Sequence, residues 1–109
     1  MLTRLVKMTF KEENADEFIS IFQANKNFIA AFEGCHSVEL QRDIKTPAIF
    51  FTISKWRSEE DLENYRKSEL FKGVWSKTKI LFAEKAEAWT LGNSNIGRFE
   101  HWTIRNSNL

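Results

Sequence analysis

The sequence predicts an α+β domain in which one antiparallel sheet carries helices on a single face. Apolar and polar residues alternate near the N-terminus, which is the period of a half-buried strand, and apolar residues then recur at helical spacing. Two further strand segments, two short helical segments and a last strand segment follow. This order is that of a split βαβ, or ferredoxin-like, sandwich.

The first strand is expected to run from Leu2 to Phe10, because Leu2, Val6, Met8 and Phe10 share one parity. A helix then starts at Asn14, since Asn14 and Glu17 have the spacing of a capping box, and it ends at Gly34. The apolar stripe of this helix consists of Phe18, Phe22, Ile29 and Phe32.

Residues 36–42 and 49–55 are expected to form a hairpin with a turn at residues 43–47. Val38 and Leu40 share one face of its first strand. Apolar side chains occupy both faces of its second strand, so both faces require burial. Because the helices can cover only one face, a second copy of the chain is expected to cover the other, which predicts a homodimer.

The second half of the domain starts with two capped helices. Ser58 is expected to start a short helix that runs to Arg66, and Ser68 a second one that runs to about Lys79, because serine is a favoured N-cap residue. A last strand is expected over residues 80–91.

A chain of 109 residues and 12.8 kDa has room for one domain. We expect this domain to span residues 1–91, because glycine, asparagine and serine mark a linker from Gly92 onward. Residues 92–109 then form a C-terminal extension, in which residues 99–104 are expected to form a short strand that docks on the partner subunit.

The charge balance and the N-terminus argue against several partners. The chain has 16 Lys and Arg against 15 Asp and Glu, so no broad basic surface for nucleic acid is expected. No apolar run approaches membrane-spanning length, and the N-terminus lacks the apolar core of a signal peptide. The single cysteine, Cys35, agrees with a reducing compartment. We therefore expect a cytoplasmic protein with neither nucleic acid nor membrane as a partner.

Aromatic residues make up 14% of the chain, more than so small a core readily hides. On the third helical segment Phe71, Trp75 and Thr78 share one face, with Tyr65 nearby on the preceding helix. The last strand opposes them with alanines that leave space: Ala83, Ala86 and Ala88. This arrangement is typical of an ordinary core, or of a pocket for a small, flat, apolar aromatic ligand.

Three polar side chains fall among these apolar positions, and each has two interpretations. Asn25 fills a gap in the first helical stripe, where it either bonds to nearby backbone or orients a ligand. Arg4 either extends to the end of the sheet or binds an anionic oxygen of a substrate. His36 shares the parity of Val38, so it is either structural or a general base.

Motifs for metals and nucleotides do not occur. His36 and His101 are the only histidines, and neither has cysteine or carboxylate at metal-ligand spacing. There is no glycine-rich phosphate loop, no nucleophile elbow and no Cys-x-x-Cys pair. We therefore expect no cofactor, and any chemistry must depend on the substrate itself.

Several short segments carry a resemblance to a known family: Gly34-Cys35-His36, residues 39–43, residues 55–62, Ser68 with Phe71, and residues 86–89. Over residues 1–91 the chain resembles the antibiotic biosynthesis monooxygenase family. That resemblance implies dimers of ferredoxin-like subunits whose sheets pack into an α+β barrel, with a pocket between each sheet and its own helices. Some members oxidise polycyclic phenols or quinols with molecular oxygen and without metal or flavin.

The chain departs from its haem-degrading relatives at three positions. Where those relatives use Asn, Trp and His, this sequence has Val6, Tyr65 and Trp75. The polyketide-hydroxylating relatives use an Asn and a Tyr where this sequence has Thr52 and Leu62, although it retains their Trp as Trp56. The resemblance therefore implies the pocket of the family, but the chain lacks the complete catalytic residues of the haem-degrading relatives and those of the polyketide-hydroxylating relatives.

The leading hypothesis is a cofactor-independent monooxygenase that oxidises an aromatic phenol or quinol. The expected catalytic residues are His36 and Tyr65, one or the other of which handles the proton, and Asn25, which orients a ring oxygen. The expected substrate-binding residues are Arg4, Val6, Phe22, Trp56, Phe71 and Trp75. The alternatives are a non-catalytic dimeric binding or stress-associated module for an apolar ligand, and a haem-binding relative.

Overall fold

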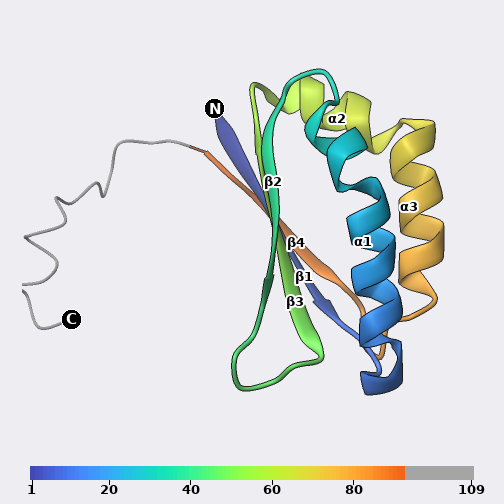
Figure 1. The fold of residues 1–109 in the computed structure, drawn as a ribbon. Helices are drawn as coiled ribbons and strands as arrows, with labels where there is room; N and C mark the ends of the chain where they lie inside the picture. Colours follow the sequence, from blue (N-terminus) through green and yellow to red (C-terminus); the bar gives the residue numbers. More distant parts are fainter. Residues whose placement is uncertain (93–109) are drawn as a thin grey trace, which may run out of the picture.

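The computed structural model describes residues 1–92 and confirms the α+β ferredoxin-like fold (Figure 1). The sheet is seen on edge in Figure 1, with all three α-helices on one side of it. The strands are β1 (Leu2–Thr9), β2 (Cys35–Arg42), β3 (Ile49–Trp56) and β4 (Glu87–Leu91). The helices are the short 3-10 helix η1 (Glu12–Asn14) and the α-helices α1 (Ala15–Ala30), α2 (Glu59–Arg66) and α3 (Glu69–Lys79).

The strands pair in the order β2-β3-β1-β4, and every neighbouring pair is antiparallel. Val6 of β1 pairs with Thr52 of β3 and Ala88 of β4. The next residue toward the N-terminus, Leu5, pairs with Ile53 and Trp89. Since side chains alternate across a strand, the Val6 row faces the helices and the Leu5 row faces away from them.

Phenylalanine rings fill one end of the space between sheet and helices. Phe10 and Phe18 stack with their ring centroids 4.3 Å apart, and Phe50 meets them edge-on at 5.7 and 5.3 Å. All three side chains are buried. Such aromatic pairs contribute about 0.5–1.5 kcal/mol beyond their burial. The room for a ligand therefore lies toward the opposite end of the sheet.

The first helix starts at its predicted N-cap residue but ends earlier than predicted. Asn14 is the N-cap residue, but its side chain makes no capping bond, and its Nδ2 instead donates to the Leu81 carbonyl at 3.3 Å. The helix ends at Ala30 rather than at Gly34. Gly34 instead has a φ of 85°, and its carbonyl accepts a hydrogen bond from the Arg57 amide at 2.8 Å.

The two serine caps are confirmed. The Ser58 hydroxyl accepts a hydrogen bond from the Asp61 amide at 3.1 Å, and the Ser68 hydroxyl accepts one from the Phe71 amide at 3.1 Å. Each bond satisfies an amide that the first turn of a helix leaves without a partner.

The last strand is shorter than predicted, because β4 starts at Glu87 rather than at residue 80. The preceding residues make isolated hydrogen bonds to the end of β1 and to the residues just after it: the Lys11 amide donates to the Leu81 carbonyl at 3.3 Å, and the Ala83 amide donates to the Thr9 carbonyl at 2.8 Å. Leu81 is buried in the phenylalanine core. The residues before Glu87 therefore cover this end of the core instead of extending β4.

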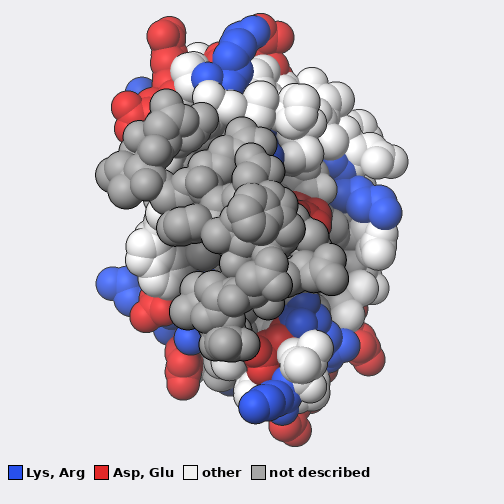
Figure 2. Space-filling model, turned by 90° about the vertical axis from the view of Figure 1, so that its left-hand side faces the viewer, with Lys and Arg blue, Asp and Glu red and all other residues white. Residues whose placement is uncertain are grey.

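Figure 2 shows the face opposite the helices, on which the visible side chains of residues 1–92 include charged ones of both signs. Within these residues no helix has both the length and the apolarity to cross a membrane. The predicted strand at residues 99–104 lies outside the described residues.

Candidate active site

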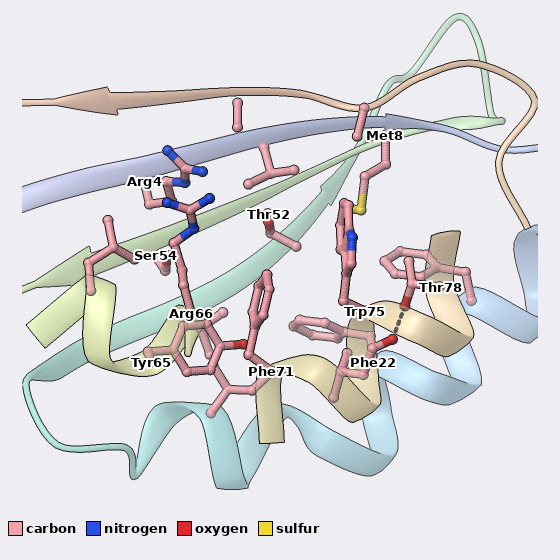
Figure 3. A pocket seen from close by; sticks show the side chains of 18 residues that line it. Arg4, Met8, Phe22, Thr52, Ser54, Tyr65, Arg66, Phe71, Trp75 and Thr78 are labelled. Atoms are coloured by element: carbon pink, nitrogen blue, oxygen red, sulfur yellow. Dashed lines mark hydrogen bonds between the residues drawn. The ribbon is translucent and has the colours of Figure 1, made fainter. Parts of the chain in front are cut away.

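A cavity of about 340 Å³ lies between the sheet and the helices (Figure 3). All four strands and all three α-helices contribute to its lining. The sheet side contributes mainly small side chains: Thr52, Ser54, Ala86 and Ala88. The helices contribute large ones: Phe18, Phe22, Ile29, Leu62, Tyr65, Phe71, Val74 and Trp75. The small residues opposite the large ones leave the space that a well-packed core would not have.

The aromatic wall of the cavity is a continuous series of ring contacts. The Phe71 ring lies 5.2 Å from that of Tyr65 and 5.9 Å from that of Trp75, to which it is nearly parallel. Trp75 meets Phe82 edge-on at 5.5 Å. On the other side of Tyr65, Trp56 stacks at 5.0 Å. Each ring is held by its neighbours, so the wall is preorganised for a flat ligand.

Trp56 supports this wall from behind. Its side chain is 0% exposed and does not line the cavity. Its Nε1 donates to the Ser54 hydroxyl at 2.9 Å, so the indole has a hydrogen-bond partner in the buried environment. Trp56 therefore holds Tyr65 by stacking, and the substrate-binding role expected for it stays a prediction.

The Tyr65 hydroxyl is the one acidic group among the described residues that line the cavity. Burial, and to a lesser degree the nearby Cys35, raises the pKa of Tyr65 to about 12. At neutral pH the phenol is therefore protonated, so Tyr65 can donate a hydrogen bond or a proton but cannot act as a base.

Two guanidinium groups occupy one end of the cavity, and Figure 3 shows them side by side. Arg4 enters from β1, and its Nη1 donates to Thr90 Oγ1 at 2.8 Å. Arg66 enters from α2, and its Nη1 lies 3.3 Å from Glu63 Oε2. Burial first, and then the charge of Arg66, lowers the pKa of Arg4, whereas Glu63 raises it. An arginine remains protonated despite such a shift.

Six residues predicted from the sequence line the cavity: Arg4, Val6, Phe22, Tyr65, Phe71 and Trp75. Asn25 does not. Its Nδ2 donates to the Ile21 carbonyl at 2.8 Å, which is the backbone bond that its structural interpretation expects.

His36 also lies outside the cavity lining and is exposed. It does not share the core-facing position of Val38, because the β2 register shifts between Cys35 and Ser37. Such a bulge inserts a residue into one strand and interrupts the alternation on which the parity argument depends.

The sequence prediction did not include Arg66 or Ser54 among the site residues. Ser54 is the cross-strand partner of Arg4, which only the β1–β3 register reveals. Arg66 follows Tyr65 directly and ends α2, and no spacing rule places such a residue in a cavity. The only sequence signal for Arg66 is that a basic residue lies next to Tyr65 in the aromatic segment.

The cavity lining contains few groups that titrate. Among the described residues that line it, only Arg4, Tyr65 and Arg66 are ionisable. Within residues 1–92, no three His, Cys, Asp or Glu side chains come together as a metal site would require. Such a cavity can enclose an aromatic ring and stabilise negative charge at one end, whereas a proton acceptor must come from solvent or from the substrate.

Residues 1–74 match the sequence profile of the antibiotic biosynthesis monooxygenase family. The chain belongs to this family. No curated protein sequence matches it significantly.

Solved structures of low sequence identity share the fold of this family member. An antibiotic biosynthesis monooxygenase superposes with a TM-score of 0.80 at 17% identity, covering 85% of this chain and 98% of its own. A conserved protein from Methanosarcina mazei Go1 gives 0.81 at 20% identity, with 86% and 94% covered. The protein Rv0793 from Mycobacterium tuberculosis gives 0.78 at 14% identity, with 84% and 93% covered.

Proposed function

We propose that this protein is a cofactor-independent monooxygenase that oxidises an aromatic phenol or quinol with molecular oxygen. Membership of the antibiotic biosynthesis monooxygenase family supports monooxygenase activity in general. The observation that carries the proposal is the cavity of about 340 Å³, which has an aromatic wall at its centre and two guanidinium groups at one end.

The reaction requires an electron-rich substrate anion. The anion transfers one electron to oxygen, and the substrate radical and superoxide then combine into a peroxide. Protonation gives a hydroperoxide, and loss of water with the second hydrogen of the same carbon converts a ring CH₂ group to a carbonyl, so one oxygen atom enters the product and the other leaves as water. The positive charge of Arg4 and Arg66 at one end of the cavity stabilises an anionic oxygen of the substrate.

Tyr65 is the residue best placed to handle a proton, because its protonated hydroxyl lies in the cavity wall. It donates a hydrogen bond to the developing negative charge on oxygen. The catalytic roles expected for Asn25 and His36 stay predictions, and neither side chain lines the cavity.

Oxygen consumption with a panel of anthrones and quinols tests the proposal. The wild-type protein should consume oxygen above the buffer rate with at least one substrate. The Tyr65→Phe variant keeps the ring stacking and should lower kcat by roughly 10²-fold. His36→Ala is the matched comparison and should retain activity. A panel without oxygen consumption would contradict the proposal, and loss of activity in His36→Ala alone would transfer the proton-handling role to His36.

A non-catalytic binding module is the second candidate, and the cavity lining favours it in one respect. Among the described lining residues, none is a carboxylate or an imidazole that could accept a proton from a substrate. If the purified protein retains an aromatic ligand that is recovered unchanged after exposure to air, this second function is supported over the first.

A further inference from the structure

The two arginines at the end of the cavity come from different layers of the fold. Arg4 lies on β1 in the sheet, and Arg66 lies at the last position of α2. Their guanidinium groups nevertheless lie side by side at the same end of the cavity (Figure 3). Placing two like charges together costs free energy, and a bound anion between them would offset that cost.

The charge at this end of the cavity is not neutralised by the described residues. Glu63 is the carboxylate within ion-pair distance of Arg66, and no carboxylate among residues 1–92 lies within that distance of Arg4. Two positive charges and one negative charge therefore leave a local net charge of +1. A single negative charge on the ligand would balance it.

The unused donors at this end suit a carboxylate. Each guanidinium carries five N–H donors, of which Arg4 uses one for Thr90 and Arg66 uses one for Glu63. Ser54 is paired with Arg4 across the strands, and its hydroxyl accepts a hydrogen bond from Trp56. The Ser54 hydroxyl proton is therefore available to a second acceptor in the cavity.

We infer that the ligand of this cavity is an aromatic carboxylic acid, whose carboxylate is bound by Arg4 and Arg66 with Ser54 as a further donor. The inference rests on the proposed function, because it assumes that the cavity is the substrate site. The Arg66 side chain is 45% exposed, so the carboxylate lies where the cavity meets solvent. The ring then extends inward against Tyr65 and Phe71.

A carboxylate fits this end better than a phosphate does. Arginine forks pair with both groups, but a phosphate monoester carries a charge of about −1.5 to −2 at neutral pH. The local charge of +1, in which Glu63 is already counted, would leave such a group only partly balanced. The local charge therefore selects a monoanion.

A matched set of probes tests the inference by isothermal titration calorimetry without oxygen. The probes are 2-naphthoate, its neutral amide 2-naphthamide, and 2-naphthyl phosphate, which share one ring system. The wild-type protein should bind 2-naphthoate at least about tenfold more tightly than 2-naphthamide, since hydrogen bonds to charged groups are the stronger ones. It should also bind 2-naphthoate more tightly than 2-naphthyl phosphate.

The variants Arg4→Gln and Arg66→Gln separate the carboxylate contacts from the rest of the site. Each should weaken 2-naphthoate binding by about tenfold or more and change 2-naphthamide binding by less than about twofold. Lys67→Gln removes the same charge from the neighbouring exposed position and should change neither affinity. Retained 2-naphthamide binding also shows that each arginine variant is folded.

Three results would overturn the inference: equal wild-type affinities for the acid and the amide, tighter binding of the phosphate, or no binding of any probe at millimolar concentration. The proposed function fails in a different way. If 2-naphthoate binds through the arginines but no phenol or quinol consumes oxygen, the carboxylate site stands and the monooxygenase does not. If the arginine variants oxidise neutral quinols as fast as the wild type does and 2-naphthoate does not bind through the arginines, the monooxygenase stands and the carboxylate site does not.

Discussion

At the scale of single residues, Gly34 occupies a position that has no room for a side chain. Its φ of 85° lies in the left-handed region that other residues rarely adopt. A Cβ atom at this position would overlap the Asp61 side chain, which Arg57 holds through two hydrogen bonds of 2.7 and 3.0 Å. The turn before β2 therefore requires glycine for both backbone and packing reasons.

The variant Gly34→Ala should lower the free energy of unfolding by about 1–3 kcal/mol, because it adds backbone strain and displaces Asp61. Gly73→Ala is the matched control. Gly73 lies inside α3, with open space where its Cβ would be, so alanine there should stabilise the protein by about 0.5–1 kcal/mol. Urea unfolding of both variants checks the pair, and equal effects would contradict the role assigned to Gly34.

At the scale of elements, one serine joins the two helices that form the aromatic wall. Ser68 Oγ donates to the Tyr65 carbonyl at 2.6 Å and accepts from the Phe71 amide at 3.1 Å. It thereby connects the end of α2 to the start of α3, where both neighbouring rings line the cavity. The orientation of the wall depends on this junction.

Ser68→Ala should lower the free energy of unfolding by about 1 kcal/mol, the usual cost of an N-cap, and should weaken binding of 2-naphthoate. Ser76→Ala is the control, since exposed Ser76 bonds only to the Gly73 carbonyl within its own helix. The control should bind 2-naphthoate as the wild type does. If Ser68→Ala loses stability and keeps full affinity, the junction supports the fold but not the wall.

The start of α2 predicts a dependence of stability on pH. Hydrogen bonds from Arg57 hold the pKa of Asp61 below its ordinary value, against the opposing effect of desolvation. Since the folded-state pKa is the lower one, the ionised carboxylate stabilises the fold above about pH 4. That contribution is lost as the pH falls through the folded-state pKa.

Asp61→Asn should therefore lower the free energy of unfolding at about pH 7, and the difference from the wild type should narrow at about pH 3. Urea titrations at the two pH values measure both differences. Glu60→Gln, at the exposed position next to it, is the control and should show no such narrowing. If the difference in unfolding free energy between Asp61→Asn and the wild type is the same at both pH values, Asp61 does not contribute to the loss of stability in acid.

The elements also show which parts of the fold are predictable from sequence. The caps at Ser58 and Ser68 were predictable, because the bonded atoms lie three residues apart in the chain. The bulge that moves His36 out of the core row was not, because it depends on pairing with β3. Parity predicted that Arg4 and Val6 lie on one face of the first strand, and both line the cavity, whereas the position of Arg66 depends on how α2 packs against the sheet.

At the scale of the whole molecule, the sheet has one face that no helix of residues 1–92 covers (Figure 1). The residues of this face include apolar ones from three strands: Leu5, Phe51, Ile53 and Trp89. Trp89 is 43% exposed, which is high for so large an apolar side chain. The homodimer predicted from the sequence would bury this face. Stable homodimer interfaces bury large and mainly apolar surfaces.

The dimer is tested by sedimentation at micromolar concentration, where the wild type should have twice the 12.8 kDa mass of the chain. Ile53 lies on the third strand between Glu39 and Leu5, so the centre of the proposed interface passes through it. Ile53→Lys places a charge there that an apolar interface cannot accommodate, and this variant should sediment as a folded monomer. Gln23→Lys adds the same charge at an exposed position of α1, on the other side of the sheet, and should remain a dimer. A wild-type monomer would leave the open face to some other partner, whereas a dimeric Ile53→Lys variant would place the interface elsewhere on the molecule.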